Sequence, residues 1–583
     1  MVYGVNEINL AEIEFDTCAE ELMYLLFAHG IEYLFLNPGT DSAPLQEAAA
    51  SLNARNVPIP RIITCSFESV ALAAAHGYWR RTGKPQAVFV HVDVGTQNLG
   101  AMLHNVFRDK AGVVLLAGRT PYSEDPTSAG SRSSSIHWQQ DIADQAGIVR
   151  GYAKWTYELV RSSDTSRVIG RAIQIAAGDI AGLAYLMLSR DVLMDPPGKG
   201  DARRIHGFAL PEPPAMSTKS LSRVVELLQG ANRPVIISGR IGWGLEGSNA
   251  LEELAELYAI PVVERGLGTN IPTSHPMSVR DDTKAKTLIA QADLLIIIEC
   301  DVPWIPSKTS ISQDATIIQI DRDPVKAAMP LWSFPVDLAI TSDGAEAVRQ
   351  LADALKARHH RVNPGLVDKG SIATTNGAEK LRTGRVSRRE IERELGVQEV
   401  VTTLNALLRP EDLVVLEAVS NNPHLLRYLE RVEAGTLCSS GGPGLGWALG
   451  ASVGIKLAEP ARRVIAIMGD GAFLFGVPTS ALCLAAEAQT PFLVIVLNNN
   501  GYRASRLPVY ELFPDGASAR MKDVIGTRFA HPPDFVAVAE ACGAYGKRVT
   551  RTEHLLPRLQ TAFDVVENGR VAVIDIGITN GEV

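Results

Sequence analysis

Polar side chains follow two apolar runs in the last third of the chain. The run 463–468 (RVIAIM) ends in 469–471 (GDG), and the run 492–497 (FLVIVL) ends in the three asparagines 498–500. A helix-length segment separates the two runs, which predicts a strand–helix–strand unit with parallel strands. Because the carboxyl ends of parallel strands share one edge of the sheet, where open α/β sheets bind ligands, these polar groups should meet there.

These groups suit a hard divalent cation and a phosphate. Asp470 offers a carboxylate, an asparagine of 498–500 offers an amide oxygen, and the backbone offers a carbonyl. Such oxygens are ligands of Mg²⁺ or Ca²⁺, and substrate phosphates complete the shell. The turn at Gly471 also opens a helix whose free N–H groups can receive phosphate. The plain alternative is an ordinary βα turn with polar capping residues. A GDG sequence on its own would be interpreted in that way.

The spacing of GDG, 26 residues and then two asparagines resembles the diphosphate-and-metal motif of thiamin-diphosphate enzymes. The resemblance implies that Mg²⁺, with Ca²⁺ as the alternative, is bound by Asp470, Asn499 and the carbonyl of Gly501. Further cofactor contacts are implied for Gly469, Gly471, Ala472 and Tyr502.

Composition and charge narrow the class of protein. The chain has 583 residues, which predicts roughly three or four domains. Its 21% charged and 46% hydrophobic residues are ordinary for a globular protein. A net charge of −9 argues against nucleic-acid partners. No apolar run reaches the roughly 18–20 residues of a membrane span, so no membrane partner is expected.

Two further features predict a cytoplasmic protein. The N-terminal segment 1–16 carries several acids and no long apolar core, so a signal peptide is not expected there. The six cysteines are scattered and form no CxxC pair. Buried free thiols in a reducing compartment are therefore favoured over a disulfide framework or a zinc site.

In the first third, apolar strand patterns alternate with helical patterns, which predicts a parallel sheet with helices on both faces. The expected helix is 16–30, and the expected strands are 32–36, 61–64, 87–92 and 113–117. Glu68 stands at the start of a helix directly after a strand, in an apolar neighbourhood. Taken alone, it is an acid favoured by the helix macrodipole.

The motif NPGT at 37–40, then Glu68, then His91 followed by a GTxN turn resembles the benzoylformate decarboxylases. The resemblance implies that Glu68 bonds to the aminopyrimidine ring of the cofactor and promotes loss of the proton from thiazolium C2. Burial among apolar groups would raise the pKa of Glu68 for that role. His91 is implied as the acid/base and Thr40 as the hydroxyl that positions the substrate carboxylate. The plain alternative for His91 is a satisfied histidine at a strand end.

A second segment, 133–155, resembles the acetolactate synthases, in which a phenylalanine-glutamine-glutamate segment borders the site. His137, Gln139 and Gln140 are the substrate-lining candidates that this resemblance implies. A polar loop without such a role is the alternative.

The middle third contains a second doubly wound pattern after a Pro- and Gly-rich linker, 190–220. Glycines in 239–244 are a weak nucleotide signal because their spacing is not GxGxxG. In the family this domain binds FAD in acetolactate synthase and ADP in oxalyl-CoA decarboxylase. No nucleotide is favoured here, but FAD or ADP stays open. His275 matches a second active-site histidine of the benzoylformate decarboxylases.

In the last third, the resemblance implies that the strand 413–416 ends in cofactor contacts. These are Ser420, Asn421 and Asn422. Leu445, a bulky residue among glycines, stands 25 residues before Asp470 and matches the apolar residue that bends the cofactor into a V. Ser505 lies where the family lines its substrate pocket. Polar or small residues replace bulky apolar ones there, so an aryl pocket is not expected.

The resemblance covers the full length and implies an α/β fold with three doubly wound parallel-sheet domains. The expected bounds are 1–189 for the pyrimidine-binding domain, 215–355 for the middle domain and 389–583 for the diphosphate-binding domain. In this family Glu68 and Leu445 serve one cofactor from different subunits, so a homodimer or homotetramer is implied.

The expected activity is thiamin-diphosphate- and Mg²⁺-dependent cleavage or formation of a C–C bond on a small 2-oxo acid, as in a decarboxylase or a carboligase. Glu68, His91 and His275 are the expected catalytic residues. A 2-hydroxyacyl-CoA lyase or oxalyl-CoA decarboxylase is one alternative. An inactive binding or regulatory protein of the same fold is another, and the intact Glu68 and metal motif argue against it.

Overall fold

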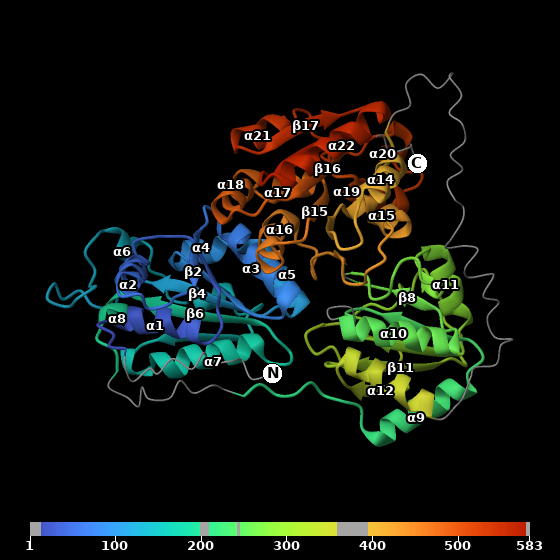
Figure 1. Ribbon diagram of the computed structural model, residues 1–583, viewed down its shortest axis with the longest axis horizontal. Coiled ribbons are helices and arrows are strands. Elements are labelled where there is room, and N and C mark those ends of the chain that lie inside the picture. The colour runs from blue at the N-terminus through green and yellow to red at the C-terminus, as the bar shows by residue number, and fades with distance from the viewer. Residues whose placement is uncertain (1–12, 199–208, 242–244, 267, 358–394, 579–583) are drawn as a thin grey trace. The chain divides into compact units, whose positions relative to one another are not determined.

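The computed structural model describes residues 13–198, 209–241, 245–266, 268–357 and 395–578 (Figure 1). Three six-stranded parallel sheets follow one another along these residues, with helices between the strands. Most strand residues are buried, because strands covered by helices on both faces carry near-continuous apolar runs. The predicted fold class is therefore confirmed.

The first sheet has the strand order β2-β1-β3-β4-β6-β5, and its neighbouring strands pair in parallel. Its strands are β1 Tyr33–Leu36, β2 Arg61–Thr64, β3 Gln86–Val90, β4 Val113–Arg119, β5 Trp155–Leu159 and β6 Leu183–Ser189. Its helices are α1 Cys18–Ala28, α2 Ala43–Ala54, α3 Glu68–Thr82, α4 Val92–Asn98, α5 Gly100–Asp109, α6 Ile136–Gln139, α7 Thr165–Ala177 and α8 Arg190–Met194.

The middle sheet has the order β12-β11-β10-β7-β8-β9. This is the doubly wound order in which the strand sequence reverses between two central strands, here β10 and β7. Its strands are β7 Pro234–Ser238, β8 Val262–Glu264, β9 Ser278–Val279, β10 Leu294–Ile298, β11 Thr316–Asp321 and β12 Leu338–Thr341. Its helices are α9 Thr218–Gly230, α10 Leu245–Tyr258, α11 Asp282–Gln291 and α12 Gly344–Ala357.

The third sheet has the order β14-β13-β15-β16-β18-β17, which repeats the pattern of the first. Its strands are β13 Leu413–Glu417, β14 Leu437–Cys438, β15 Val464–Gly469, β16 Leu493–Asn498, β17 Tyr545–Val549 and β18 Ala572–Gly577. Its helices are α14 Val397–Leu407, α15 Asn422–Tyr428, α16 Trp447–Ala458, α17 Asp470–Phe475, α18 Pro478–Ala488, α19 Arg503–Leu512, α20 Ala517–Met521, α21 Phe535–Ala541 and α22 Thr552–Glu567.

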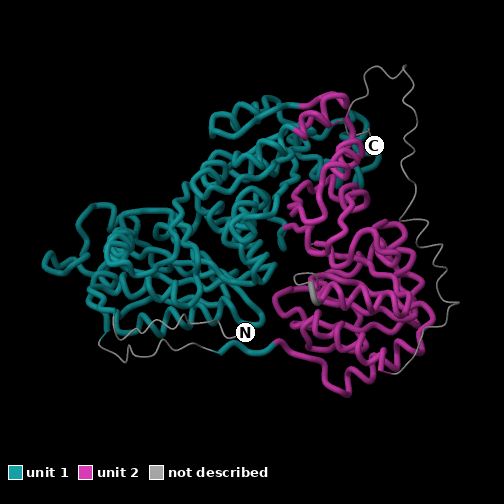
Figure 2. The backbone as a smooth tube through the Cα atoms, viewed as in Figure 1, with its two compact units in different colours: residues 1–212, 440–548, 561–575 teal, residues 213–439, 549–560, 576–583 magenta. Residues whose placement is uncertain are grey.

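The chain forms two compact units (Figure 2). Unit 1 contains residues 1–212, 440–548 and 561–575, and unit 2 contains 213–439, 549–560 and 576–583. Unit 1 therefore holds the first sheet together with β15, β16, α16 to α21 and most of β17 and β18.

Within unit 1, helices α3 and α16 pack backbone against backbone because glycines face the contact. A Cβ on Gly454 would lie 1.8 Å from the carbonyl oxygen of Ala74, and a Cβ on Gly77 would lie 2.2 Å from that of Ala451. A buried polar network fastens the same contact. Trp447 Nε1 donates to His76 at 3.0 Å, and His76 bonds to Asp109 at 2.6 Å.

Most predicted elements are present, with shifted ends. Strand β2 has the expected bounds, whereas the strand expected at 87–92 stops at Val90 because the chain turns into α4. Helix 16–30 is shorter, and Thr17 caps it by accepting the Glu20 N–H at 3.3 Å. The expected linker 190–220 contains α8 and the first residues of α9. None of the described helices is long and apolar enough to cross a bilayer.

Candidate active site

The carboxyl edge of the third sheet holds the buried carboxylate of Asp470. This residue begins α17 directly after β15 and is 1% exposed. Its Oδ2 accepts the Gly501 N–H at 2.8 Å, and its Oδ1 accepts the Gly471 N–H at 2.9 Å. Burial raises the pKa of Asp470, and the backbone donors oppose that shift. A buried carboxylate of this kind is stabilised by pairing with a cation.

The three asparagines that follow β16 have different surroundings. Asn498 donates from Nδ2 to Asp575 at 2.9 Å, and Asn500 is exposed with a φ of +59°. Asn499 instead has a buried Oδ1 without a hydrogen-bond partner in the described part of the chain. Leaving a buried acceptor unpaired is unfavourable, so this oxygen favours a bound ligand. Asn499 fits a cation site better than its two neighbours do.

The turn after β16 needs a glycine and brings Tyr502 over α17. Gly501 has a φ of +143°, and a Cβ there would lie 2.2 Å from the carbonyl oxygen of Thr527. Tyr502 donates its N–H to that same oxygen at 2.8 Å. A Cβ on Gly471 would meet the Tyr502 ring at 2.8 Å, and Ala472, the next residue, is buried. The chemistry of this edge, one carboxylate with amide and backbone oxygens, suits Mg²⁺.

Leu445 is half-buried between two constrained glycines at the entrance to α16. The Asn105 side chain donates to the Gly444 carbonyl at 2.8 Å and accepts the Gly444 N–H at 2.9 Å. Gly446 has a φ of +94°, and a Cβ there would lie 2.4 Å from the carbonyl oxygen of Phe475. The backbone that carries Leu445 is therefore fixed on both sides.

The edge of the first sheet carries Glu68 at the first position of α3, directly after β2, as predicted. The side chain is half-buried, and its Oε2 accepts from Asn98 Nδ2 at 3.1 Å. Gly95 leaves room for the carboxylate, because a Cβ there would lie 3.1 Å from Glu68 Oε1. Asn98 belongs to the predicted GTxN turn, which forms most of α4. The structure thus brings two parts of the motif into contact.

His91 follows β3 and bonds to a residue that the sequence did not single out. Its Nδ1 lies 2.5 Å from Asp41 Oδ1, and Asp41 is 3% exposed. The hydrogen bond to Asp41 is the main reason why the pKa of His91 is raised. Burial opposes it, and the charges of Asp41, Asp93 and Glu68 reinforce it. His91 is thereby favoured in its protonated form.

The segment 133–140 contains helix α6 as well as loop residues. His137 is 2% exposed, and its Nδ1 accepts the Ser133 N–H at 3.0 Å. Burial lowers the pKa of His137, and the positive charges of Arg190 and Arg132 add to this. The predicted Gln140 is buried, with both side-chain polar atoms unpaired among the described residues, whereas Gln139 is exposed.

Thr40 and Ser505 are both exposed. Thr40 is the residue before Asp41, and Ser505 lies in the first turn of α19, which begins after Tyr502. Each is therefore adjacent in sequence to groups described above, but the structure shows no bond that assigns either to a substrate.

In unit 2, the residues after β13 contain a further buried side-chain amide without hydrogen-bond partners among the described residues. Asn421 is 1% exposed, and its Oδ1 and Nδ2 both lack a partner among the described residues. Asn422 accepts the Ala418 N–H at 3.2 Å, and Ser420 is half-buried. The two unpaired polar atoms of Asn421 fit a polar ligand group at this strand end.

His275, also in unit 2, is 7% exposed and faces its own domain. Its Nδ1 accepts the Met277 N–H at 3.1 Å, and its Nε2 lies 3.4 Å from Glu256 Oε1 of α10. The Nε2 of His275 is buried and forms no hydrogen bond within the described residues.

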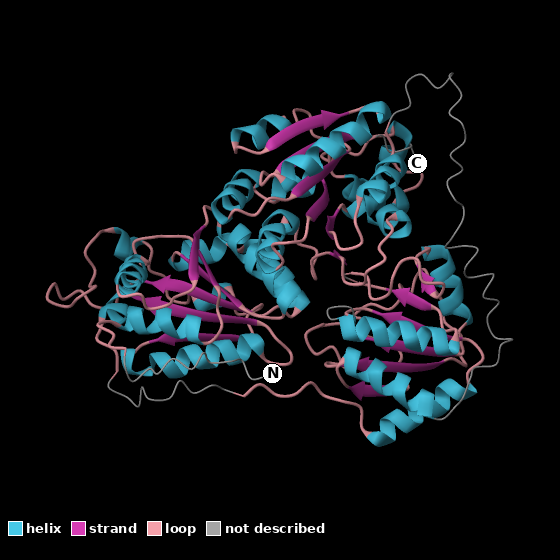
Figure 3. Ribbon diagram, viewed as in Figure 1, coloured by secondary structure: helices cyan, strands magenta, loops and turns pink. Residues whose placement is uncertain are grey.

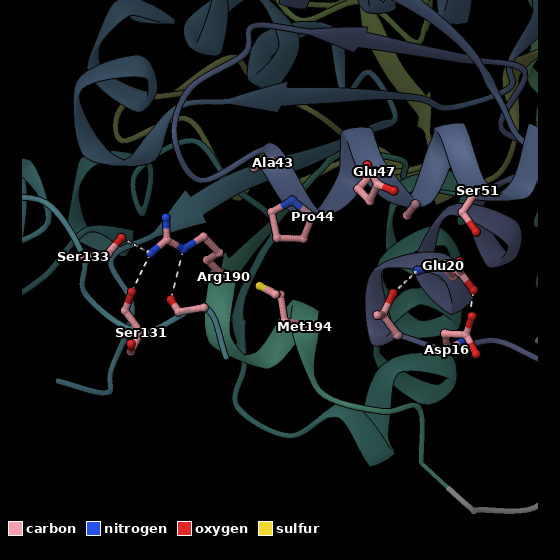
Figure 4. Close-up of a pocket in the computed structure, with 13 residues that line it drawn as sticks. Asp16, Glu20, Ala43, Pro44, Glu47, Ser51, Ser131, Ser133, Arg190 and Met194 are labelled. Atoms are coloured by element: carbon pink, nitrogen blue, oxygen red, sulfur yellow. Dashed lines mark hydrogen bonds between the residues drawn. The ribbon is translucent and has the colours of Figure 1, made fainter. Parts of the chain in front are cut away.

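A separate cavity of about 620 Å³ opens in unit 1 between α1, α2 and α8 (Figure 4). None of the predicted site residues lines it. Arg190 extends along its wall and donates to the Gly130 carbonyl at 3.0 Å and to Ser133 Oγ at 3.1 Å. These bonds hold the loop whose Ser133 N–H fixes the ring of His137.

Sequence reasoning missed Asp41 and the orphaned state of Asn421. Asp41 directly follows the NPGT motif, so its position was available, but the pair that it forms spans 50 residues. No local pattern reveals a contact of that range.

A parallel α/β scaffold with glycine turns, a buried acid and orphaned amides at strand ends defines a cofactor-dependent enzyme. Three models of known families match this chain. The "Thiamine pyrophosphate enzyme, N-terminal TPP binding domain" matches residues 16–148, the central domain matches 221–351, and the C-terminal TPP binding domain matches 420–576. The chain therefore belongs to the thiamine pyrophosphate enzyme family, whose cofactor is thiamin diphosphate.

Curated relatives agree with this assignment. Benzoylformate decarboxylase of Pseudomonas aeruginosa is 25% identical over 559 residues, which cover 92% of this chain and 95% of the relative. An acetolactate synthase of Mycobacterium avium is 25% identical over 572 residues, covering 96% and 87%.

Solved structures share the fold. A thiamine diphosphate-dependent 4-hydroxybenzoylformate decarboxylase of Rhodococcus jostii RHA1 superposes with a TM-score of 0.78 at 22% identity, covering 97% of this chain and all 100% of the other. The benzoylformate decarboxylase of Polynucleobacter necessarius gives 0.77 at 19% identity, covering 97% and 99%.

Proposed function

We propose that this enzyme uses thiamin diphosphate and Mg²⁺ to break the bond between the carboxylate and the carbonyl carbon of a 2-oxo acid, with release of CO₂. The observation that carries the proposal is the third-sheet edge, where buried Asp470 and the orphaned oxygen of Asn499 follow adjacent parallel strands. Asp470, Asn499 and the Gly501 carbonyl would hold the metal. The likeness to benzoylformate decarboxylase supports the reaction class.

The cofactor, when bound, supplies the nucleophilic carbon and the electron sink for the cleavage. This chain's residues orient the reactants and move protons. Glu68 would exchange a proton with the aminopyrimidine ring of the bound cofactor, and Asn98 holds the Glu68 carboxylate in place. His91, protonated beside Asp41, donates a proton to the developing oxyanion of the substrate carbonyl.

Further cofactor contacts are assigned to residues that already lie at strand or helix ends. They are Leu445, Gly469, Gly471, Ala472, Tyr502 and, in unit 2, Ser420, Asn421 and Asn422. The two orphaned atoms of Asn421 support this assignment.

The substrate end of the site is assigned to His137, Gln140, Gln139, Thr40 and Ser505. The buried, unpaired amide of Gln140 supports a polar substrate group near α6. Exposed Ser505, in place of a bulky apolar residue, favours a small or polar 2-oxo acid over an aryl one. His275 is assigned a second proton-transfer role. Among the assigned site residues it has the weakest structural support, because its Nε2 lies beside Glu256 of its own domain.

Carboligation is a second outcome at the same site. Several relatives are acetolactate synthases, and the likeness to them supports this second outcome. Protonation of the carbon that has lost CO₂ would give an aldehyde, whereas addition of that carbon to a second carbonyl would give a new C–C bond. Access of a second substrate decides between them.

We assign the pyrimidine-binding domain to 1–189, the middle domain to 215–355 and the diphosphate-binding domain to 389–583. A homodimer or homotetramer is proposed, because large apolar side chains are exposed on and after α19. Leu512 is 71% exposed, and Ile525 is 85% exposed. Six free cysteines support a cytoplasmic location. No role is assigned to FAD or ADP in the middle domain.

The test starts from protein stripped of cofactor and measures the binding of thiamin diphosphate with and without Mg²⁺ by calorimetry. CO₂ release is then screened over pyruvate, longer 2-oxo acids and benzoylformate, with aldehyde and acyloin products separated by chromatography. Mg²⁺-dependent binding together with CO₂ release from at least one substrate is expected. Failure of all the acids would favour an acyl-CoA substrate, and failure of cofactor binding would favour a non-catalytic role.

A further inference from the structure

The contact between His91 and Asp41 is built into the first sheet by the residues around it. Gly39 and Gly118 leave the space that the pair occupies. A Cβ on Gly39 would lie 2.2 Å from His91 Nδ1, and a Cβ on Gly118 would lie 1.4 Å from Asp41 Oδ2. Any other residue at Gly118 would displace the carboxylate. The pair therefore depends on two glycines from different parts of the fold.

Asp41 also holds the backbone that aims His91. Its second oxygen, Oδ2, accepts the Val92 N–H at 3.2 Å. Val92 has a φ of +31°, which is strained for a β-branched residue. Such strain persists only where surrounding contacts enforce it, and it gathers at functional sites. One buried carboxylate thus bonds both to the His91 ring and to the turn that presents that ring.

The environment of His137, the second histidine near this edge, favours the neutral form of its ring. The Nδ1 of His137 accepts a backbone N–H, so its neutral form carries the proton on Nε2. Burial, and after it the positive charges of Arg190 and Arg132, lower the pKa of His137, against the charge of Asp41. The pKa of His91 is raised by its hydrogen bond to Asp41, against burial, and by the charges of Asp41, Asp93 and Glu68. Pairs of titratable groups that are driven apart in this way mark separate acid and hydrogen-bonding roles.

We propose that Asp41 is a positioning residue that keeps His91 as an imidazolium with Nδ1 bonded to the carboxylate and Nε2 directed toward the substrate. Since a carboxylate accepts only, the Nδ1 proton stays on the ring. The transferable proton is then the one on Nε2. This inference rests on the proposed function for its catalytic meaning, but the charge state of His91 is measurable without turnover.

The test compares the wild-type protein with Asp41→Asn, which removes the charge but keeps an acceptor for Nδ1. Diethyl pyrocarbonate modifies only neutral imidazole, so the labelling rate of His91 against pH, followed by peptide mass spectrometry, reports its pKa. The labelling midpoint is expected to fall by about 1 pH unit or more in Asp41→Asn, since an adjacent opposite charge shifts a pKa by roughly 1–3 units.

Two further variants make the result specific. Gly118→Ala alters no titratable group but displaces the carboxylate, so the same downward shift is expected. Asp93→Asn removes a nearby charge that is not hydrogen-bonded to His91, so a much smaller shift is expected. Circular dichroism confirms the fold of each variant. An unchanged midpoint in folded Asp41→Asn overturns the inference, as does an equal shift in Asp93→Asn.

Activity gives a second readout if the proposed function holds. Because protonated His91 is the acid and its pKa is raised, kcat/KM should fall as pH rises through that pKa, and Asp41→Asn should move this fall to lower pH. Adding Asp41→Asn to His91→Gln should cause no further loss, whereas a purely structural role for Asp41 would add one. If no substrate releases CO₂, the proposed function fails, and the labelling midpoint still decides the inference.

Discussion

The first and third sheets share one strand order but carry different chemistry. In both, the third strand along the chain lies next to the first and the fourth. Figure 3 shows the strands in magenta and the helices in cyan. His91 follows that strand in the first sheet, and Asp470 follows it in the third. One position of the scaffold thus holds a half-exposed imidazole in one sheet and a buried carboxylate in the other.

The difference extends to the neighbours of these two residues. His91 and nearby Glu68 are ionisable side chains that lie partly open to solvent. Around Asp470 the hydrogen-bond partners are backbone N–H groups. Proton transfer needs groups that change charge, whereas anchoring needs fixed dipoles and a constant charge. The same fold therefore supports two tasks because function resides in the strand-end residues.

Glu68→Gln should give the largest effect and tests the first sheet. Loss of the titrating carboxylate should lower turnover by about 10²–10⁴-fold, as for other general acid–base groups. Cofactor affinity should change little, because glutamine can still accept from Asn98. CO₂ release measures turnover, and calorimetric titration measures cofactor affinity. The control is Glu47→Gln, which replaces an exposed acid on α2. Full turnover in Glu68→Gln would contradict the proton-transfer role assigned to Glu68.

Asp470→Ala tests the third sheet, where we expect a change in cofactor affinity and none in the titration of His91. Mg²⁺-dependent cofactor affinity should fall by more than about 100-fold, because even residues that only support a metal ligand contribute 10–100-fold. The labelling midpoint of His91 should stay unchanged, since the two edges have separate tasks. Asp523→Ala, which removes an exposed carboxylate, should bind normally. Normal Mg²⁺-dependent cofactor affinity in Asp470→Ala would contradict the anchoring role assigned to the third sheet.

Asn499→Ala separates the metal ligand from its neighbours. We expect Mg²⁺ to be required at about tenfold higher concentration, at the lower end of the range for supporting groups. Asn500→Gly is the matched control, because Asn500 is exposed and its positive φ suits glycine. Titration of cofactor binding against Mg²⁺ distinguishes them. An equal effect of the two substitutions would contradict the choice of Asn499.

Gly454→Ala should have the smallest effect, and it concerns the contact between α3 and α16. The added Cβ would overlap the carbonyl oxygen of Ala74, and overpacking of this kind typically destabilises by about 1–3 kcal/mol. Gly230→Ala, in helix α9, meets no atom within 4 Å and should be neutral or stabilising. Thermal unfolding measures both. A stable Gly454→Ala would show that the two helices can separate.

Much of the fold follows from local pattern. The alternation of apolar strands with helical segments predicted β1 to β4, β13, β15 and β16, and β2 has the predicted bounds. The strand expected at 87–92 is shorter, because a bond from Asp41 to the Val92 N–H helps to turn the chain into α4. That bond joins residues 51 positions apart, and strand propensity does not contain it.

In the candidate site, too, some features follow from the sequence and others only from the tertiary structure. Its spacing places Glu68 and Asp470 at the ends of predicted strands, since parallel strands present their carboxyl ends at one edge. Environment, however, distinguishes Asn499 from Asn498, whose amide is bound to Asp575. Identical residue types in a row give no basis for that choice.

By itself, the sequence determined the α/β class, the cofactor and the residues at the strand ends, because periodicity and motif spacing are local properties of the chain. Tertiary structure alone decided the partner of His91, the orphaned asparagines and the glycine contact between α3 and α16. These depend on contacts between distant segments, whose geometry is set by how the sheets and helices pack.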